Sequence, residues 1–269
     1  MKLYFALSSG EDNKQVFQIL PEANILASYF YFKSDSRLSQ LKEINVLNTK
    51  RFILDSGAYS AYTLGKKINI LDYINFIKEN KVRQYANLDK IGDPKGTAKN
   101  YEIMKKEGLN PKPVFHMGES FKYLEPMLES KYIALGGMVG GINLESWLDE
   151  VFNFIYKKTN KIKIHGFGMT NTQLVCKFPW HSVDSTSWLS PVAFGRFSKW
   201  DKVRNKFKVI QTDEFLSLNN FSYDNKMPAE IRNFLLQSQV KEYVKFSNFV
   251  NNKHNNTNFN YLTAQQKLF

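Results

Sequence analysis

Cysteine is almost absent from this sequence, since Cys176 is the only one in 269 residues. A single cysteine excludes an internal disulfide and is typical of a protein in a reducing compartment. It also excludes the common structural zinc sites, which take two or more thiolates. The glycine-rich segment at residues 136–141 does not match the motifs of nucleotide cofactors, whereas residues 166–168 could bind a phosphate. We therefore predict neither a metal nor a cofactor.

Long apolar runs are missing as well. No stretch approaches the roughly 20 residues that a membrane-spanning helix needs. The apolar run at residues 1–7 is too short for a signal peptide and lacks a cleavage site. We expect a soluble, cytoplasmic protein with no membrane partner. With 43% hydrophobic and 15% aromatic residues, the chain can build the core of one large α/β domain or two small ones.

Acidic residues are fewer than basic ones, 25 against 37, so the net charge is +12. Solubility alone, or the Lys-rich and Asn-rich composition that an AT-rich genome produces, would account for a general excess of basic residues. The excess is nevertheless concentrated in residues 196–208, where aromatic residues alternate with the basic residues Arg196, Lys199, Lys202, Arg204, Lys206 and Lys208. Basic groups attract phosphates and aromatic rings can stack on bases, so this segment predicts a nucleic-acid partner.

Short apolar runs, each followed by a polar or glycine-containing turn, recur through the first 190 residues. They predict strands at residues 3–7, 25–32, 52–55, 84–89, 113–117, 132–138, 162–169 and 183–188. The second of these segments could equally be a helix. Helical spacing separates many of them, most clearly in the stripe from Leu144 to Ile155, which Asn143 is placed to cap. Eight strands alternating with helices predict a (β/α)₈ barrel of the TIM type, with a doubly wound open sheet as the alternative.

We expect the barrel to occupy residues 1–190 and a C-terminal extension to occupy residues 191–269. Residues 191–225 show no clear period. Pro228 is suited to the first turn of a long helix that runs to about residue 250. Residues 251–260 are rich in asparagine and are typical of a linker or tail.

Ionisable residues and glycines gather at the predicted carboxyl ends of the strands. Because such barrels build their active sites there, we expect these residues to meet on one rim. Each also has a plainer interpretation: the carboxylates can cap turns, and the histidine can be a core residue. The residues are Asp55, Asp89, His116, Gly136, Gly137, the turn at residues 165–168, and Asp184.

Several of these segments, taken in order, are similar to motifs of one known family. They are Ile25-Leu26-Ala27-Ser28-Tyr29, Asp55-Ser56-Gly57-Ala58-Tyr59, Ile133-Ala134-Leu135-Gly136-Gly137-Met138-Val139-Gly140, His165-Gly166-Phe167-Gly168-Met169-Thr170 and Val183-Asp184-Ser185-Thr186-Ser187. Their order resembles the tRNA-guanine transglycosylase superfamily, including its DNA-modifying members that insert 7-deazaguanine bases. The resemblance covers roughly residues 1–190 and lies more in motif order than in any one motif.

The chain also departs from that family. The tRNA-acting enzymes carry a Cys-x-Cys-x₂-Cys…His zinc site after the nucleophile strand, and no residues here can supply it. His116 stands where the family has a glutamine that reads the base. Without the zinc subdomain the substrate is expected to be DNA, with tRNA as the alternative.

The resemblance implies a base exchange in two steps. Asp184 would attack the anomeric carbon of a guanosine nucleotide and expel guanine, which leaves a covalent glycosyl-enzyme intermediate. Asp55 would handle the proton of the leaving and incoming bases, and Asp89 would accept hydrogen bonds from the guanine-like edge. His116 and nearby backbone amides would contact the base carbonyl. The implied substrate-binding set adds Ser56, Gly57, Gly136, Gly137, Met138, Gly166, Phe167, Gly168 and Met169, with Tyr59, Phe167 or Met169 against the ring.

Two other functions fit the same residues. A barrel N-glycosidase or glycoside hydrolase would use the two carboxylates with water in place of the incoming base. A non-catalytic nucleic-acid-binding protein would use only the basic segment. Partners expected for the first hypothesis are DNA or tRNA, a small 7-deazaguanine base, and further DNA-modification proteins.

Overall fold

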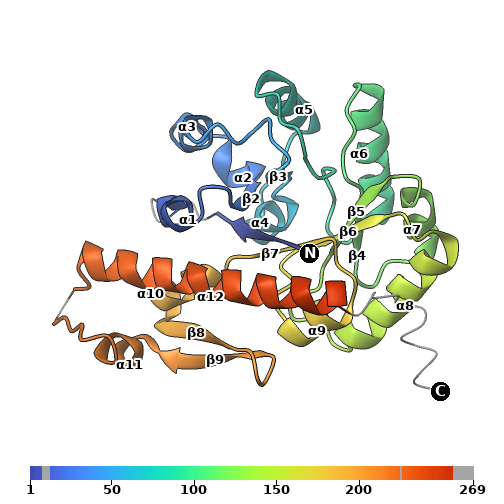
Figure 1. Ribbon diagram of the computed structural model, residues 1–269. Helices are drawn as coiled ribbons and strands as arrows, with labels where there is room; N and C mark the ends of the chain where they lie inside the picture. The colour runs from blue at the N-terminus through green and yellow to red at the C-terminus, as the bar shows by residue number, and fades with distance from the viewer. Residues whose placement is uncertain (8–12, 225, 257–269) are drawn as a thin grey trace, which may run out of the picture. The chain divides into compact units, whose positions relative to one another are not determined.

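The computed structural model describes residues 1–7, 13–224 and 226–256 of the chain (Figure 1). The chain forms two compact units, of which unit 1 comprises Met1–Ala23 and Met169–Phe269 and unit 2 comprises Asn24–Gly168. The sequence predicts a boundary at residue 190, whereas in the structure residues 169–190 belong to the same unit as the C-terminal extension.

Unit 2 contains five parallel strands, and each is largely buried. They are β2 (Asn24–Ser28), β3 (Phe52–Asp55), β4 (Val114–His116), β5 (Tyr132–Gly136) and β6 (Lys163–Gly166). β2 pairs with β3, and β5 lies between β4 and β6. Their apolar runs, such as Ile53 and Leu54 or Ile133 to Leu135, are buried as expected for strands covered on both faces.

The predicted strand at residues 84–89 is reduced to two isolated parallel bridges. Leu54 pairs with Tyr85, and Ala86 pairs with Lys112. Beyond Ala86 the backbone turns, since the Asp89 N–H donates to the Asn87 carbonyl at 3.0 Å. The described residues therefore form seven parallel strands. The α/β class is confirmed, but the predicted closed (β/α)₈ barrel is wrong.

Helices of unit 2 follow the apolar stripes of the sequence and flank its strands (Figure 1). In the longest, α8, the stripe residues Leu148, Val151, Phe152 and Ile155 are fully buried. Asn143 precedes α8 in a left-handed conformation and makes no side-chain cap, contrary to the prediction. The helices are α2 (Tyr29–Phe32), α3 (Asp35–Glu43), α4 (Ala58–Thr63), α5 (Ile70–Glu79), α6 (Pro94–Lys106), α7 (Phe121–Met127) and α8 (Leu144–Lys158).

Unit 1 is built around the parallel pair of β1 (Lys2–Ala6) and β7 (Ser182–Ser185). The Trp188 indole N–H donates to the Ala6 carbonyl at 3.0 Å, which fixes the turn after β7 against β1. Short helices complete this part of the unit: α1 (Lys14–Ile19), α9 (Thr172–Lys177), η2 (Ser187–Leu189) and α10 (Ser190–Phe194).

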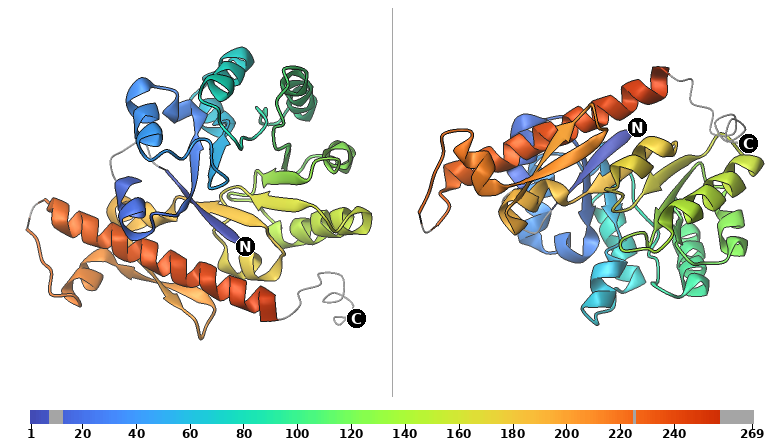
Figure 2. Two further views of the ribbon diagram at one scale, coloured as in Figure 1. Left: turned by 45° about the horizontal axis from the view of Figure 1, so that its top comes forward. Right: turned by 90° about the horizontal axis from the view of Figure 1, so that it is seen from below.

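The C-terminal extension contains an antiparallel hairpin that the sequence did not predict. Its strands are β8 (Arg196–Asp201) and β9 (Lys206–Gln211), followed by α11 (Thr212–Ser217) and the long α12 (Ala229–Asn256). α12 runs along the hairpin (Figure 2). Phe197 and Ile210 pack with Leu216, Ile231 and Leu235 in a shared core. The helix that Pro228 was expected to open is confirmed and extends to Asn256.

Among the residues that the structure describes, no helix combines the length and apolarity that crossing a membrane requires.

Candidate functional site

The carboxyl ends of the strands in unit 2 carry most of the predicted site residues. Asp55 ends β3 in register with Ser28 of β2, and His116 ends β4 in register with Gly136 of β5. Ser56 follows β3 directly. Because parallel strands present their carboxyl ends at the same edge of a sheet, these residues share the edge where α/β proteins bind their ligands.

Asp89 is the centre of a buried hydrogen-bond network at this edge. The Ser56 hydroxyl donates to Asp89 Oδ1 at 2.7 Å, and His116 Nε2 lies 2.9 Å from Asp89 Oδ2. Ser56 is fully buried, and Asp89 and His116 are only 9% and 8% exposed. A buried carboxylate requires such partners, because desolvation without them is costly. The structure therefore brings together three residues that lie far apart in the sequence.

Glu119 completes the network and was not predicted from the sequence. One of its carboxylate oxygens lies 3.2 Å from His116 Nδ1, and the other accepts the His116 backbone N–H at 3.0 Å. Burial alone would lower the pKa of His116, but the hydrogen bonds that its ring donates to Asp89 and Glu119, with the charges of these carboxylates, outweigh burial and raise this pKa to about 9. At neutral pH the ring is therefore an imidazolium that donates to two carboxylates.

This arrangement changes the role expected for His116. An imidazolium has two N–H donors, and here both are directed at carboxylates, Asp89 on one side and Glu119 on the other. No ring donor is left for a ligand carbonyl. We interpret His116 as a positioning residue that fixes Asp89 and keeps a positive charge beside it. Asp89 retains lone pairs, since each carboxylate oxygen can accept more than one hydrogen bond.

Asp55 begins a sharp turn that requires glycine at position 57. Its Oδ2 accepts the Gly57 N–H at 3.0 Å, so the carboxylate does cap the following turn. Gly57 has φ +77°, and a Cβ on it would lie 2.4 Å from both Ser28 Oγ and Phe30 Cβ. The same turn brings the Ala58 N–H to Ser56 Oγ at 3.1 Å. Capping and a chemical role for Asp55 are compatible, because each carboxylate oxygen can accept more than one hydrogen bond.

The glycines at the end of β5 and directly after it allow the chain to pass close to His116. A Cβ on Gly136 would lie 2.9 Å from His116 Cδ2, and one on Gly137, at φ +70°, would lie 3.2 Å from the Met117 backbone nitrogen. Phe167, after β6, packs on the apolar cluster of Ala86, Val114 and Ala134. Gly166 and Met138 are buried, and Gly168 has φ +60°. Gly136 and Gly137 therefore permit the close approach to His116 and Met117.

Asp184 and Met169 belong to unit 1, whereas the other predicted substrate-site residues belong to unit 2. Asp184 lies in β7 opposite Tyr4 of β1 and is 6% exposed. The next residue, Ser185, is buried, and its hydroxyl accepts the Ser187 N–H at 3.0 Å. Tyr243 of α12 hydrogen-bonds to both serines. Burial of an acid at the end of a strand is costly and is typical of a paired or functional group.

The basic segment forms the β8–β9 hairpin, and its aromatic residues do not have the predicted role. Phe197 and Trp200 are buried, the latter against Phe246 and Phe249 of α12 with ring centroids 4.8 and 5.3 Å apart. Phe207 contacts Trp200 and Tyr243. Phe197 and Trp200 therefore belong to the core of unit 1 and do not offer faces for stacking on bases, whereas Phe207 is half-buried. The six basic side chains are exposed.

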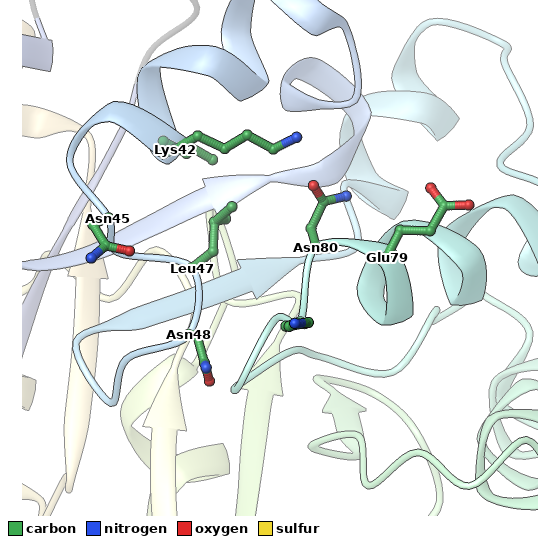
Figure 3. Close-up of a pocket in the computed structure, with 8 residues that line it drawn as sticks. Lys42, Asn45, Leu47, Asn48, Glu79 and Asn80 are labelled. Carbon is green, nitrogen blue, oxygen red and sulfur yellow. The ribbon is translucent and has the colours of Figure 1, made fainter.

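A pocket of about 430 Å³ lies in unit 2 (Figure 3). It lies at the loop before β3 and at the end of α5, so it is found at the amino ends of the strands. Lysine, asparagine and glutamate side chains around it include none of the predicted site residues. Its lining is Leu41, Lys42, Asn45, Leu47, Asn48, Glu79, Asn80 and Lys81.

Within the described ranges, no group of three or more histidine, cysteine, aspartate or glutamate side chains is arranged to hold a metal ion. Comparison of the sequence with protein-family models and with curated proteins finds no match.

Proposed function

We propose that this protein exchanges guanine for a 7-deazaguanine base in nucleic acid, with DNA as the expected substrate, and that it acts in the cytoplasm. The observation that carries the proposal is the buried network of Ser56, Asp89, His116 and Glu119 at the carboxyl ends of the strands in unit 2. It holds the Asp89 carboxylate beside a fixed cation, and its Ser56 lies in the same turn as Asp55.

Asp89 is suited to read a guanine-like edge. Such an edge presents adjacent N–H donors, and a carboxylate is an acceptor with two oxygens that matches them. Ser56 and His116 hold the two oxygens of Asp89 from behind at 2.7 and 2.9 Å, so the carboxylate does not reorganise on binding. A neighbouring imidazolium also offsets the cost of keeping this charge away from water.

The chemistry then needs a nucleophile and a group that moves a proton. We assign the nucleophile to Asp184, whose carboxylate would form a bond to the anomeric carbon as the bond from that carbon to guanine breaks. We assign the proton to Asp55, which would protonate the departing guanine and later accept a proton from the incoming base. Attack by the incoming base on the glycosyl-enzyme would release Asp184 and complete the exchange without any net redox change.

The direct test is the incorporation of radiolabelled guanine into DNA and, separately, into tRNA by the purified protein. Label should enter DNA with the wild-type chain and fall to background with Asp184→Asn, while DNA binding by that variant persists. Asp55→Asn should also lose exchange. Asp72→Asn, which changes an exposed carboxylate on α5, is the matched control and should exchange normally.

Other outcomes of the same assay contradict the proposal in distinct ways. Exchange that persists in Asp184→Asn removes the nucleophile assignment. Release of free guanine without any incorporation of label indicates an N-glycosidase. Incorporation into tRNA alone moves the substrate from DNA to RNA. Nucleic-acid binding with neither reaction leaves a non-catalytic binding protein.

A further inference from the structure

The β8–β9 hairpin presents three lysines on one face. Its register places Lys199 opposite Lys208 and Asp201 opposite Lys206. Residues that pair across strands point to the same side, and so do residues two apart along a strand. Lys199, Lys206 and Lys208 therefore share one face of the hairpin, here called the lysine face, with Asp201 as the single acid.

The lysine face is not neutralised by the rest of the described chain. None of its three lysines forms an ion pair within 4 Å of a described acid. Asp201 Oδ1 instead accepts the Val203 and Arg204 N–H groups of the hairpin turn at 2.9 and 3.0 Å. These bonds and nearby positive charge lower the pKa of Asp201. Like charges placed directly opposite one another destabilise a hairpin, so the Lys199–Lys208 pair has a cost that folding alone does not explain.

Protection of a free strand edge explains only part of this pattern. Lysines on an edge strand discourage pairing with other chains, which accounts for Lys206 and Lys208 on β9. It does not account for Lys199, because α12 covers the outer edge of β8. There the Gln239 side chain bonds both the N–H and the carbonyl of Ser198 at 2.8 Å, and Glu242 accepts the Trp200 N–H at 2.7 Å.

The same contacts fix the hairpin in place, and Trp200 and Phe207, which pair with one another, lie on the face opposite the three lysines. Trp200 is 9% exposed and its ring packs among Phe207, Phe246 and Phe249. A ligand on the lysine face would meet ammonium groups and not rings. Ammonium groups pair with phosphates as point charges, without reading bases.

We propose that the lysine face binds the phosphate backbone of nucleic acid without stacking and without sequence preference. The inference rests on the proposed function only for the choice of ligand, since the face would hold the strand from which a nucleotide is presented for exchange. Binding through three lysines should be electrostatic and strongly dependent on salt.

Fluorescence anisotropy with a labelled duplex of mixed sequence, and with one of its single strands, tests this proposal. The triple variant Lys199→Gln, Lys206→Gln, Lys208→Gln should bind more weakly at low salt. Its plot of log affinity against log salt should be less steep by about 2 to 3, since each phosphate contact contributes about 0.7 on single strands and 0.9 on duplexes. Between about 50 and 200 mM salt, the fold loss of affinity should be smaller than in the wild type by about 40-fold on duplex.

Two controls separate a local effect from a general loss of charge. Lys95→Gln, Lys99→Gln, Lys106→Gln removes the same charge from exposed positions on α6 and should leave the salt slope unchanged. Replacing the three hairpin lysines by arginine should preserve binding. The single variant Lys199→Gln should weaken binding measurably, since edge protection does not involve this residue.

Failure of this inference is distinguishable from failure of the proposed function. If the wild type binds and the hairpin variant matches the α6 control, the lysine face is not the binding surface, whatever the exchange assay shows. If the hairpin variant loses binding but labelled guanine is never incorporated, the surface stands and the base-exchange proposal fails. If the wild type binds no nucleic acid at all, both fail.

Discussion

One proton on His116 connects three of the site residues and can be followed directly. The ring lies 2.9 Å from Asp89 and 3.2 Å from Glu119, and these contacts raise the pKa of His116 to about 9 despite burial. Glu119→Gln removes one of the two charges that hold the proton. We expect the pKa of His116 to fall by about one unit or more, and an NMR titration of the imidazole resonances measures it.

Two further variants make that titration decisive. His116→Gln identifies the His116 resonance among the four histidines of the chain. Glu125→Gln, which alters an exposed carboxylate on α7 that pairs with Lys158 of α8, should leave the titration of His116 as it is in the wild type. If His116 titrates identically in the wild type and Glu119→Gln, Glu119 does not hold the proton and the positioning role is wrong.

The residues of this site differ in how well the sequence predicts them. Asp55, Asp89 and His116 were predicted because each follows an apolar run, and strand ends are recognisable. Glu119 was missed because it lies three residues beyond a strand end, in a turn where a glutamate is usually solvated. Its spacing could have indicated the contact, because a turn can bring an acid side chain back to a histidine three residues earlier in the sequence. Burial of the aromatic rings in the hairpin could not be predicted from the local sequence, because it depends on contacts with α12, over 40 residues further along the chain.

At the scale of elements, side chains of α12 supply the backbone hydrogen bonds that a third strand would otherwise make to the edge of β8. The buried side chain of Gln239 mimics a peptide group, with its oxygen accepting the Ser198 N–H and its nitrogen donating to the Ser198 carbonyl. Gln239→Leu leaves both backbone groups without that partner. We expect a loss of about 2 kcal/mol in the free energy of unfolding and faster hydrogen exchange of the hairpin amides.

Urea denaturation measures the first effect and mass-resolved hydrogen exchange the second. Lys241→Leu, at an exposed position on the same helix, is the control for adding a leucine and should change neither. Gln239→Glu keeps the acceptor but buries a carboxylate oxygen against the Ser198 carbonyl, so it should destabilise at least as much as Gln239→Leu. Equal stability of Gln239→Leu and the wild type would mean that water replaces the side chain and that α12 does not fix the hairpin.

Elements were predictable where their period was strong and local. The apolar stripe of α8 and the apolar runs of β3 and β5 appear where expected. The residues of α8 alone indicate a helix with one buried face, and those of β3 and β5 indicate strands buried on both faces. The hairpin was missed because charges interrupt its alternation, and its inward residues face different neighbours along its length. The segment 84–89 is apolar enough for a strand, but side-chain bonds bend it: Asn87 Nδ2 donates to the Thr97 carbonyl and Asn100 Nδ2 to the Leu88 carbonyl.

For the whole molecule, two buried groups oppose one another in how stability depends on pH. His116 has a pKa raised from the ordinary 6.5 to about 9, so the stability it contributes is complete below pH 6.5 and is lost as pH rises through 9. Lys112 is 8% exposed, and burial, with Lys163 nearby, lowers its pKa from 10.5 to about 7. Its protonation therefore destabilises the fold below pH 7, and that cost is relieved as pH rises from 7 towards 10.5.

Between pH 7 and 9 these two effects should cancel, because each changes the free energy of unfolding by about 1.4 kcal/mol per pH unit in opposite directions. Lys112→Met should be more stable than the wild type at pH 7, since its side chain over the Tyr132 ring no longer carries a desolvated charge. Its stability relative to the wild type should fall by about 2 to 3 kcal/mol by pH 9. His116→Gln should change in the other direction, and Lys161→Met, at an exposed position, should follow the wild type. Urea denaturation at pH 7, 8 and 9 tests this, and parallel curves for Lys112→Met and the wild type would show that the buried lysine does not titrate in this range.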